Sequence, residues 1–92
     1  MSHMTPTQIR AVATISLGVI EAVEAAGEQG APAGVLYAAM QAQGASFNQF
    51  MSLMGTLVRP GYLTLEDNCY RSTPTTPELK TKLTNTLAAF AS

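Results

Sequence analysis

The chain has little charge and little of the chemistry that enzymes use. Asp, Glu, Lys and Arg make up 12% of its 92 residues, about half the proportion usual for globular proteins. The one histidine, His3, falls within residues 1–4, which we interpret as a cloning scar with Met4 as the native start. Because general acid–base catalysis needs a positioned histidine, carboxylate, lysine or similar group, we expect no enzyme activity.

Cysteine and long apolar runs are also scarce. A single cysteine, Cys69, excludes an intramolecular disulfide and favours a reducing compartment, so we expect a cytoplasmic protein. No apolar run reaches the length of a membrane span, and no charged-then-apolar signal peptide opens the chain. The sequence also lacks a Gly-rich phosphate loop and a cluster of zinc ligands. We therefore expect neither a membrane contact nor a cofactor or metal.

The chain is nevertheless rich enough in apolar residues to fold. Hydrophobic residues make up 47% of it, and the formal net charge is −1. That balance argues against disorder and predicts one domain, over residues 5–92, with a modest core. Low charge at this apolar content also indicates that a partner or a second copy covers part of the apolar surface. A domain that holds nucleic acid mainly by charge is usually clearly basic.

The first predicted helix spans residues 5–26. Thr5, Pro6 and Gln8 form a strong start signal, because Thr can cap, Pro fits the first helical position and Gln completes a capping box. Further apolar residues lie beside the main stripe, so we expect this helix to face the core on one side and a dimer partner on the other. The main stripe is Val12, Ile15, Val19 and Val23, widened by Ile9, Ala13, Leu17 and Ile20.

Two more helices follow a Gly/Pro loop that has room for a very short strand at Gly30 and Ala31. One helix is expected over residues 32–43 and ends at Gly44, and the next is expected over residues 46–59 with Ser46 as its cap. The expected inward residues are Val35, Leu36 and Met40 in the first of these helices, and Phe47, Phe50, Leu53, Met54 and Leu57 in the second.

The remaining residues predict a hairpin and a final helix. Two strands are expected over residues 62–65 and 69–72, joined by the tip 66–68. In the second strand, Cys69 is expected to be partly buried and to act as a small hydrophobic residue. The last helix is expected over residues 76–91 with a cap at Thr76. Its apolar stripe is Leu79, Leu83, Leu87 and Phe90.

Residues 30–74 contain the segment VLYAAMQAQGASFNQFMSLMGTLVRPGYLTLEDNCYRSTP, which resembles a winged helix-turn-helix domain. Its Leu-rich helix end, Gly-aromatic-aliphatic step, polar tip and Tyr-Arg pair are similar to those of IclR- and MarR-type bacterial transcriptional regulators. The resemblance implies a mainly α fold with a small β-hairpin, in the order α-α-α-β-β-α. It implies that Leu57, Leu63 and Tyr70 form the core of the wing. It further implies a homodimer through the flanking helices 5–26 and 76–91.

The resemblance also implies a function, that of a small regulator that binds double-stranded DNA. The helix over residues 46–59 would then lie in the major groove with its first residues at the base edges. Arg59 and Arg71 would flank the wing and contact backbone phosphates. The candidates for base reading are Ser46, Asn48, Gln49 and Ser52.

The charge pattern supports a different function for the same shape. Residues 46–57 contain no Lys or Arg, and the wing tip carries Glu66 and Asp67, which phosphates repel. Arg59 can instead complement the C-terminus of its own helix, and Arg71 can form a surface pair. The alternative to DNA binding is a protein-interaction module that binds no DNA. The usual role of the fold favours DNA, whereas the charge favours the module.

Overall fold

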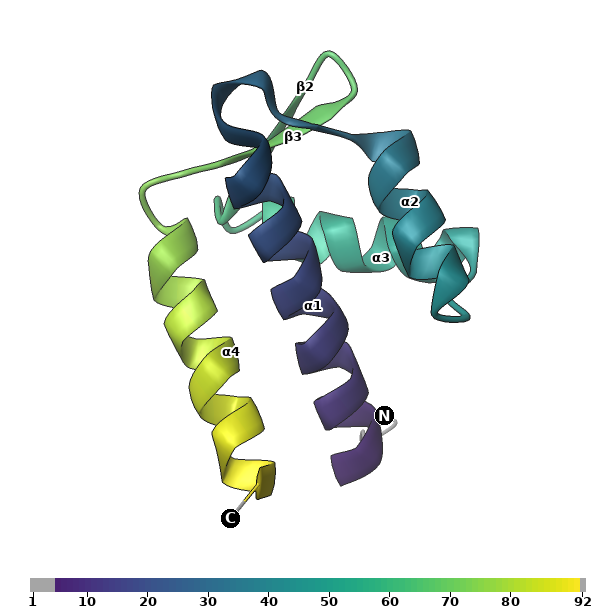
Figure 1. The fold of residues 1–92 in the computed structure, drawn as a ribbon, viewed down its shortest axis with the longest axis vertical. Helices are drawn as coiled ribbons and strands as arrows, with labels where there is room; N and C mark the ends of the chain where they lie inside the picture. The colour runs from purple at the N-terminus through teal and green to yellow at the C-terminus, as the bar shows by residue number, and fades with distance from the viewer. Residues whose placement is uncertain (1–4, 92) are drawn as a thin grey trace.

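The fold consists of helices packed around a small antiparallel sheet (Figure 1). The structure is a computed structural model that describes residues 5–91. The order of elements is compatible with a winged-helix-like fold. The elements are α1 (Pro6–Ala26), the 3₁₀ turn η1 (Gly27–Gln29), β1 (Ala31–Pro32), α2 (Ala33–Ala42), α3 (Phe47–Val58), β2 (Leu63–Glu66), β3 (Cys69–Ser72) and α4 (Thr76–Ala91).

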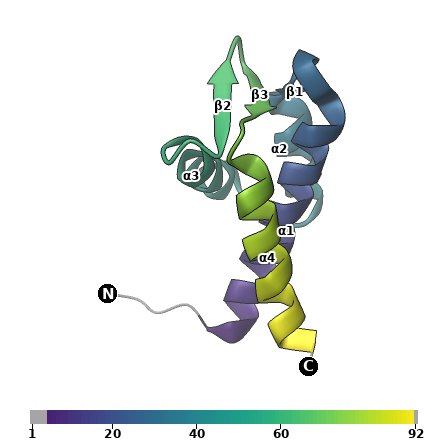
Figure 2. The same ribbon diagram turned by 90° about the vertical axis from the view of Figure 1, so that its left-hand side faces the viewer.

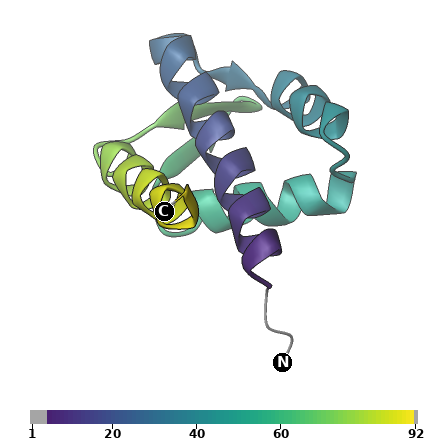
Figure 3. The ribbon, with the colours of Figure 1, turned by 60° about the horizontal axis from the view of Figure 1, so that its bottom comes forward.

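Helices α1 and α4 run side by side in opposite directions, and the other elements gather at the C-terminal end of α1 (Figures 1 and 2). The view in Figure 3 shows α1 crossing α3. The C-terminal half of α1 therefore lies against the sheet and α2, while its N-terminal half extends beyond them beside α4. This arrangement divides the molecule into two regions. We call the sheet, α2, α3 and the C-terminal half of α1 the body, and the rest of α1 with α4 the helix pair.

Capping boxes start both α1 and α3. The Thr5 hydroxyl accepts a hydrogen bond from the Gln8 backbone N–H at 3.1 Å, and the Gln8 side chain accepts one from the Thr5 N–H at 2.9 Å. Ser46 and Gln49 repeat this exchange at 3.1 and 2.8 Å. Each box satisfies two of the backbone donors that a helix start leaves free, which confirms both predicted starts. The sharp turn before α3 uses Gly44 at a φ of 93°, where a side chain would be strained.

The sheet has the strand order β1-β3-β2, with both pairs antiparallel. In the hairpin formed by β2 and β3, Leu65 is opposite Tyr70 and Glu66 is opposite Cys69. The two residues of the tip, Asp67 and Asn68, have φ values of 52° and 60°. Positive φ at both central residues fits the twist of a two-residue hairpin, and Asp and Asn tolerate this conformation well. The sequence predicted the hairpin and the short strand, but β1 and β2 each lie one residue later than expected, so the tip has two residues and not three.

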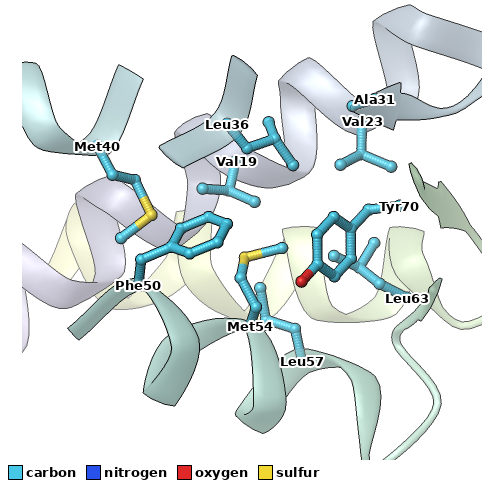
Figure 4. Packing of buried hydrophobic residues seen from close by; sticks show 10 residues of the cluster. All are labelled: Val19, Val23, Ala31, Leu36, Met40, Phe50, Met54, Leu57, Leu63 and Tyr70. Carbon is cyan, nitrogen blue, oxygen red and sulfur yellow. The ribbon is translucent and has the colours of Figure 1, made fainter. Parts of the chain in front are cut away.

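One buried cluster joins α1, α2, α3 and the sheet (Figure 4). Phe50, Met54 and Leu57 of α3 point into it, and the ring of Phe50 meets the ring of Tyr70 edge-on at 6.5 Å. Leu57, Leu63 and Tyr70 are buried in this one cluster, so their prediction as core residues is confirmed. The cluster comprises Val19, Val23, Ala31, Leu36, Met40, Phe50, Met54, Leu57, Leu63 and Tyr70.

Three side chains that helical spacing assigned to the core lie on the surface instead. Val35 is 63% exposed because the rest of the body covers the other side of α2, where Leu36 and Met40 lie. Phe47 is 55% exposed, since it lies in the first turn of α3 and only its edge meets a neighbouring ring. Val12 is 44% exposed because α1 continues past the end of the core.

The start of α4 also differs from the prediction. Thr76 was predicted to cap α4, but it is the first residue of the helix itself and not the residue before it. Its side chain is fully buried. Its hydroxyl donates to the Tyr62 carbonyl at 2.6 Å and accepts from the Thr73 N–H at 2.7 Å. Thr76 therefore ties the start of α4 to the segment before the hairpin. Beyond this point the predicted apolar stripe is half-buried at Leu83 and Leu87, and exposed at Phe90.

Three further sequence predictions concern residues 1–4, Cys69 and membrane spans. Residues 1–4, which include His3, lie outside the described residues. Cys69 is half-buried, as predicted. Along residues 5–91, none of the helices combines the length and the apolar character needed to cross a lipid bilayer.

Candidate interaction surface

Two of the four residues proposed to read bases use their side chains to cap a helix. Ser46 and Gln49 form the capping box of α3, with each side chain bonded to the backbone of the other residue. The carbonyl oxygen of the Gln49 side chain is occupied, so bidentate pairing with adenine would require that box to open. Asn48 and Ser52 are exposed on α3. The structure thus places Ser46, Asn48 and Gln49 at the start of α3 and Ser52 near its middle, and the cap leaves Asn48 and Ser52 free.

Arg59 is directed back onto its own helix. Its Nε donates to the Gly55 carbonyl at 3.2 Å, and its backbone N–H bonds to the same oxygen at 3.0 Å. A carbonyl near the end of a helix is a favourable site for a cation. Gly55 leaves room for this contact, because a side-chain Cβ there would lie 3.2 Å from the guanidinium. The contact matches the structural interpretation of Arg59 rather than a phosphate-binding one.

Arg71 connects the hairpin to the loop after α1. Its guanidinium donates to the carbonyl of Glu28 at 2.8 Å, of Gln29 at 3.3 Å and of Glu66 at 3.4 Å. The side chain also packs over Gly30, where a Cβ would lie 3.0 Å from Cγ of Arg71. Arg71 therefore has backbone partners that the sequence did not reveal, in place of the surface pair considered for it.

Both lysines of α4 form ion pairs, Lys80 with the C-terminal half of α1 and Lys82 within α4. Lys80 Nζ lies 3.0 Å from a carboxylate oxygen of Glu24, and Lys82 Nζ lies 3.4 Å from one of Glu78. The hydrogen bond to Glu24 and the charge of that carboxylate raise the pKa of Lys80. The hydrogen bond to Glu78 is the largest cause that raises the pKa of Lys82. These lysines serve contacts within the chain and lie on a different helix from the proposed reader.

The hairpin tip carries exposed acids. Glu66 and Asp67 are both exposed, and neither carboxylate forms an ion pair with a basic side chain among residues 5–91. Within the same residues, no group of three His, Cys, Asp or Glu side chains could hold a metal ion. The tip is therefore an acidic projection.

A groove of about 730 Å³ lies between α1 and α3. Its floor is apolar and includes Val12 and Ile15 of α1 and Leu53 of α3, while Gln49 and Ser52 line the α3 side. A smaller hollow of about 350 Å³ shares Ala11 and Ile15 with the groove. Two proposed base readers thus line a mainly apolar groove.

Large apolar side chains are exposed around this groove and at the start of α3. Ile9 and Val12 lie on the N-terminal half of α1, and Phe47 and Met51 lie on α3. The Phe47 ring meets Tyr37 of α2 edge-on at 5.4 Å, which holds it in place at the surface. Val12 lines the groove, whereas Phe47 and Met51 lie on another side of α3 from its groove-lining residues. Exposed apolar side chains that gather at one place mark interaction sites in folded proteins. We call the groove together with the neighbouring Ile9 the α1–α3 surface.

Sequence reasoning missed the groove but contained its signal. The stripe Val12, Ile15, Val19 and Val23 was assigned to one core-facing side, and its second half is indeed buried. Its first half lines the groove, because α3 crosses α1 and leaves a gap beside the N-terminal turns. An apolar stripe that extends beyond the core is the sequence feature that indicates a further contact surface on the helix.

Comparison with known proteins gives no relative. No protein family matches the chain, and neither a curated protein nor a solved structure does. The properties of the site therefore depend on its own geometry.

Proposed function

We propose that this domain is a winged-helix protein-interaction module that binds a protein partner through the α1–α3 surface. One observation carries the proposal. Of the five Lys and Arg residues, Arg59 and Arg71 bond to backbone carbonyls, and Lys80 and Lys82 pair with carboxylates. Only Arg10 is left without such a contact among residues 5–91, and α3 meets solvent with neutral and apolar side chains.

That arrangement suits a protein surface better than a phosphate backbone. Tight DNA binding usually depends on several cations that neutralise phosphates, and each contact contributes to a steep salt dependence. Protein interfaces instead bury aromatic, Met and aliphatic side chains and are depleted in charge at their centre. Phe47, Met51 and Val12 are exposed side chains of the second kind.

A photo-crosslinking experiment in the source organism tests this proposal. A photoreactive amino acid at Ser52, on the rim of the groove, should crosslink a protein when the cells are irradiated. The same amino acid at Thr64, which is exposed on β2, serves as the control. Crosslinks at position 64 with none at position 52 would contradict the proposed surface.

DNA binding is the second candidate, and the exposure of Asn48 and Ser52 on α3 favours it. In that function these two side chains would contact base edges, and Arg59 would exchange the Gly55 carbonyl for a phosphate. Arg59→Glu is the informative variant, because Arg71→Glu would also disturb the loop contacts of Arg71. A homodimer through α1 and α4 that covered Ile9 and Phe90 is compatible with DNA binding, whereas it would compete with a protein partner for Ile9.

A further inference from the structure

We infer that the partner segment bound in the α1–α3 groove is an amphipathic helix with acidic residues flanking its apolar face. This inference rests on the proposed function and specifies the partner's chemistry. It depends on three properties of the groove, which are its shape, the charge of its lining and the hydrogen-bonding groups left free at its rim.

The shape of the groove suits the side of a helix. Two helices, α1 and α3, form its walls, and residues at helical spacing line both of them, with Gln8, Val12 and Ile15 on one wall and Gln49, Leu53 and Thr56 on the other. A volume of about 730 Å³ accommodates several large apolar side chains. Because Val12 and the neighbouring Ile9 project into solvent, an elongated apolar segment covers more of this surface than a small molecule does. Helices bound in grooves supply such anchors at i, i+3, i+4 and i+7.

The lining of the groove and the adjoining hollow has charge of one sign. Arg10 is the only charged side chain that lines either of them, and neither is lined by Asp or Glu. Arg10 is exposed, and among residues 5–91 it is the one cation without an intramolecular hydrogen bond or ion pair from its side chain. An occupant with carboxylates beside its apolar face is therefore complementary to this rim, whereas one with lysines is repelled.

Gln8 and Gln49, at the rim of the groove, also favour an occupant with carboxylates. The side-chain oxygen of Gln8 already accepts a hydrogen bond from the Thr5 N–H. The side-chain oxygen of Gln49 accepts one from the Ser46 N–H. The groups left free are the two NH₂ donors, one on each wall of the groove. Donors of this kind pair with carboxylate or carbonyl oxygens. Both walls thus offer donors, and Arg10 adds a positive charge beside them.

A pair of designed peptides tests the inference. The first is a helix of about 18 residues, long enough to be helical alone, with leucine at i, i+3, i+4 and i+7 and glutamate flanking that stripe. The second has lysine at every glutamate position. Amide chemical shifts of the ¹⁵N-labelled full chain are followed while each peptide is added at low salt.

The glutamate peptide should shift the amides of residues 8–15 and 49–56 and bind about three- to fivefold more tightly than the lysine peptide, as expected for exposed charge pairs. Arg10→Glu should reverse this preference. Val12→Glu should weaken both peptides, whereas Val35→Glu, at an exposed position on α2, should weaken neither.

Three results would overturn the inference. The first is that neither peptide shifts the amides of the groove residues up to about 1 mM. The second is that the two peptides bind with equal affinity. The third is that the groove residues shift with protein concentration when no peptide is present, which would identify a second copy as the occupant. If the peptides fail while crosslinks form at position 52, the acidic helix is wrong and the interaction function stands. If both fail, the proposed function is wrong as well.

Discussion

The two halves of α1 have similar side chains and different surroundings. In the C-terminal half, Val19 is 5% exposed and Val23 is fully buried, because the sheet, α2 and α3 enclose them. In the N-terminal half, Ile9 is 38% exposed and Val12 is 44% exposed. An apolar stripe identifies the side of a helix that is suited to contact another apolar surface. It does not show whether the chain itself supplies the other side.

The largest effect that this comparison predicts is on stability. Met54→Ala removes a side chain from the centre of the body and should lower the free energy of unfolding by about 2–5 kcal/mol, as for other buried large-to-small changes. Val12→Ala, in the helix pair, should change it by less than about 1 kcal/mol because Val12 is already in contact with water. Urea titrations of both variants measure the difference. Equal losses would mean that the N-terminal half of α1 belongs to the core.

The junction between the two regions should show the next largest effect. Thr76→Val keeps the shape of a fully buried side chain but removes its bonds to the Tyr62 carbonyl and the Thr73 N–H. Leaving buried polar groups unpaired costs about 1–3 kcal/mol. Thr81→Val is the matched control, since the Thr81 hydroxyl is exposed and bonds only within α4. If urea titration gives the same small change for both variants, Thr76 does not tie α4 to the body.

A smaller effect is expected at the edge of the body. Arg71→Met retains an apolar stem and removes the guanidinium bonds to the carbonyls of Glu28 and Gln29. Half-exposed charged hydrogen bonds of this kind contribute about 1–2 kcal/mol. Hydrogen exchange should become faster in the loop after α1 and remain unchanged in α4. Unchanged exchange in that loop would show that Arg71 does not hold it.

The smallest effect concerns the Lys80–Glu24 pair and depends on pH. The pair raises the pKa of Lys80, so the folded state binds this proton more tightly than the unfolded state. The stabilisation is therefore complete below the ordinary lysine value of 10.5 and is lost as pH rises through the raised value. Lys80→Met should lower the Tm slightly at neutral pH, and its difference from the wild type should shrink at high pH. A difference that does not depend on pH would assign the effect to packing.

Local patterns predicted helix starts and the hairpin turn in both regions, because these features depend on short-range rules. The caps at Thr5 and Ser46 and the turn at Asp67 and Asn68 each follow from residues only a few positions apart. The mainly helical fold with a small antiparallel sheet follows from those elements and their apolar stripes.

The contacts that decide the interpretation of the site could not be predicted in the same way. Arg71 bonds to carbonyls more than 40 positions away in the chain, and no local pattern specifies such a pair. The groove requires the crossing of α1 over α3, which depends on how the helices pack. The sequence therefore indicated Arg71 as a candidate site residue but not its backbone partners. It indicated Val12 as part of an apolar stripe but not that its side chain is exposed.

The most direct test of the central claim, that α3 faces a protein and not DNA, is fluorescence anisotropy of a labelled random-sequence duplex titrated with the protein at low salt. We expect no binding, because four of the five cations contact their own chain. Binding that weakens steeply with added salt and is lost in Arg59→Glu would contradict the claim, since it would show that these side chains leave their partners to reach phosphates.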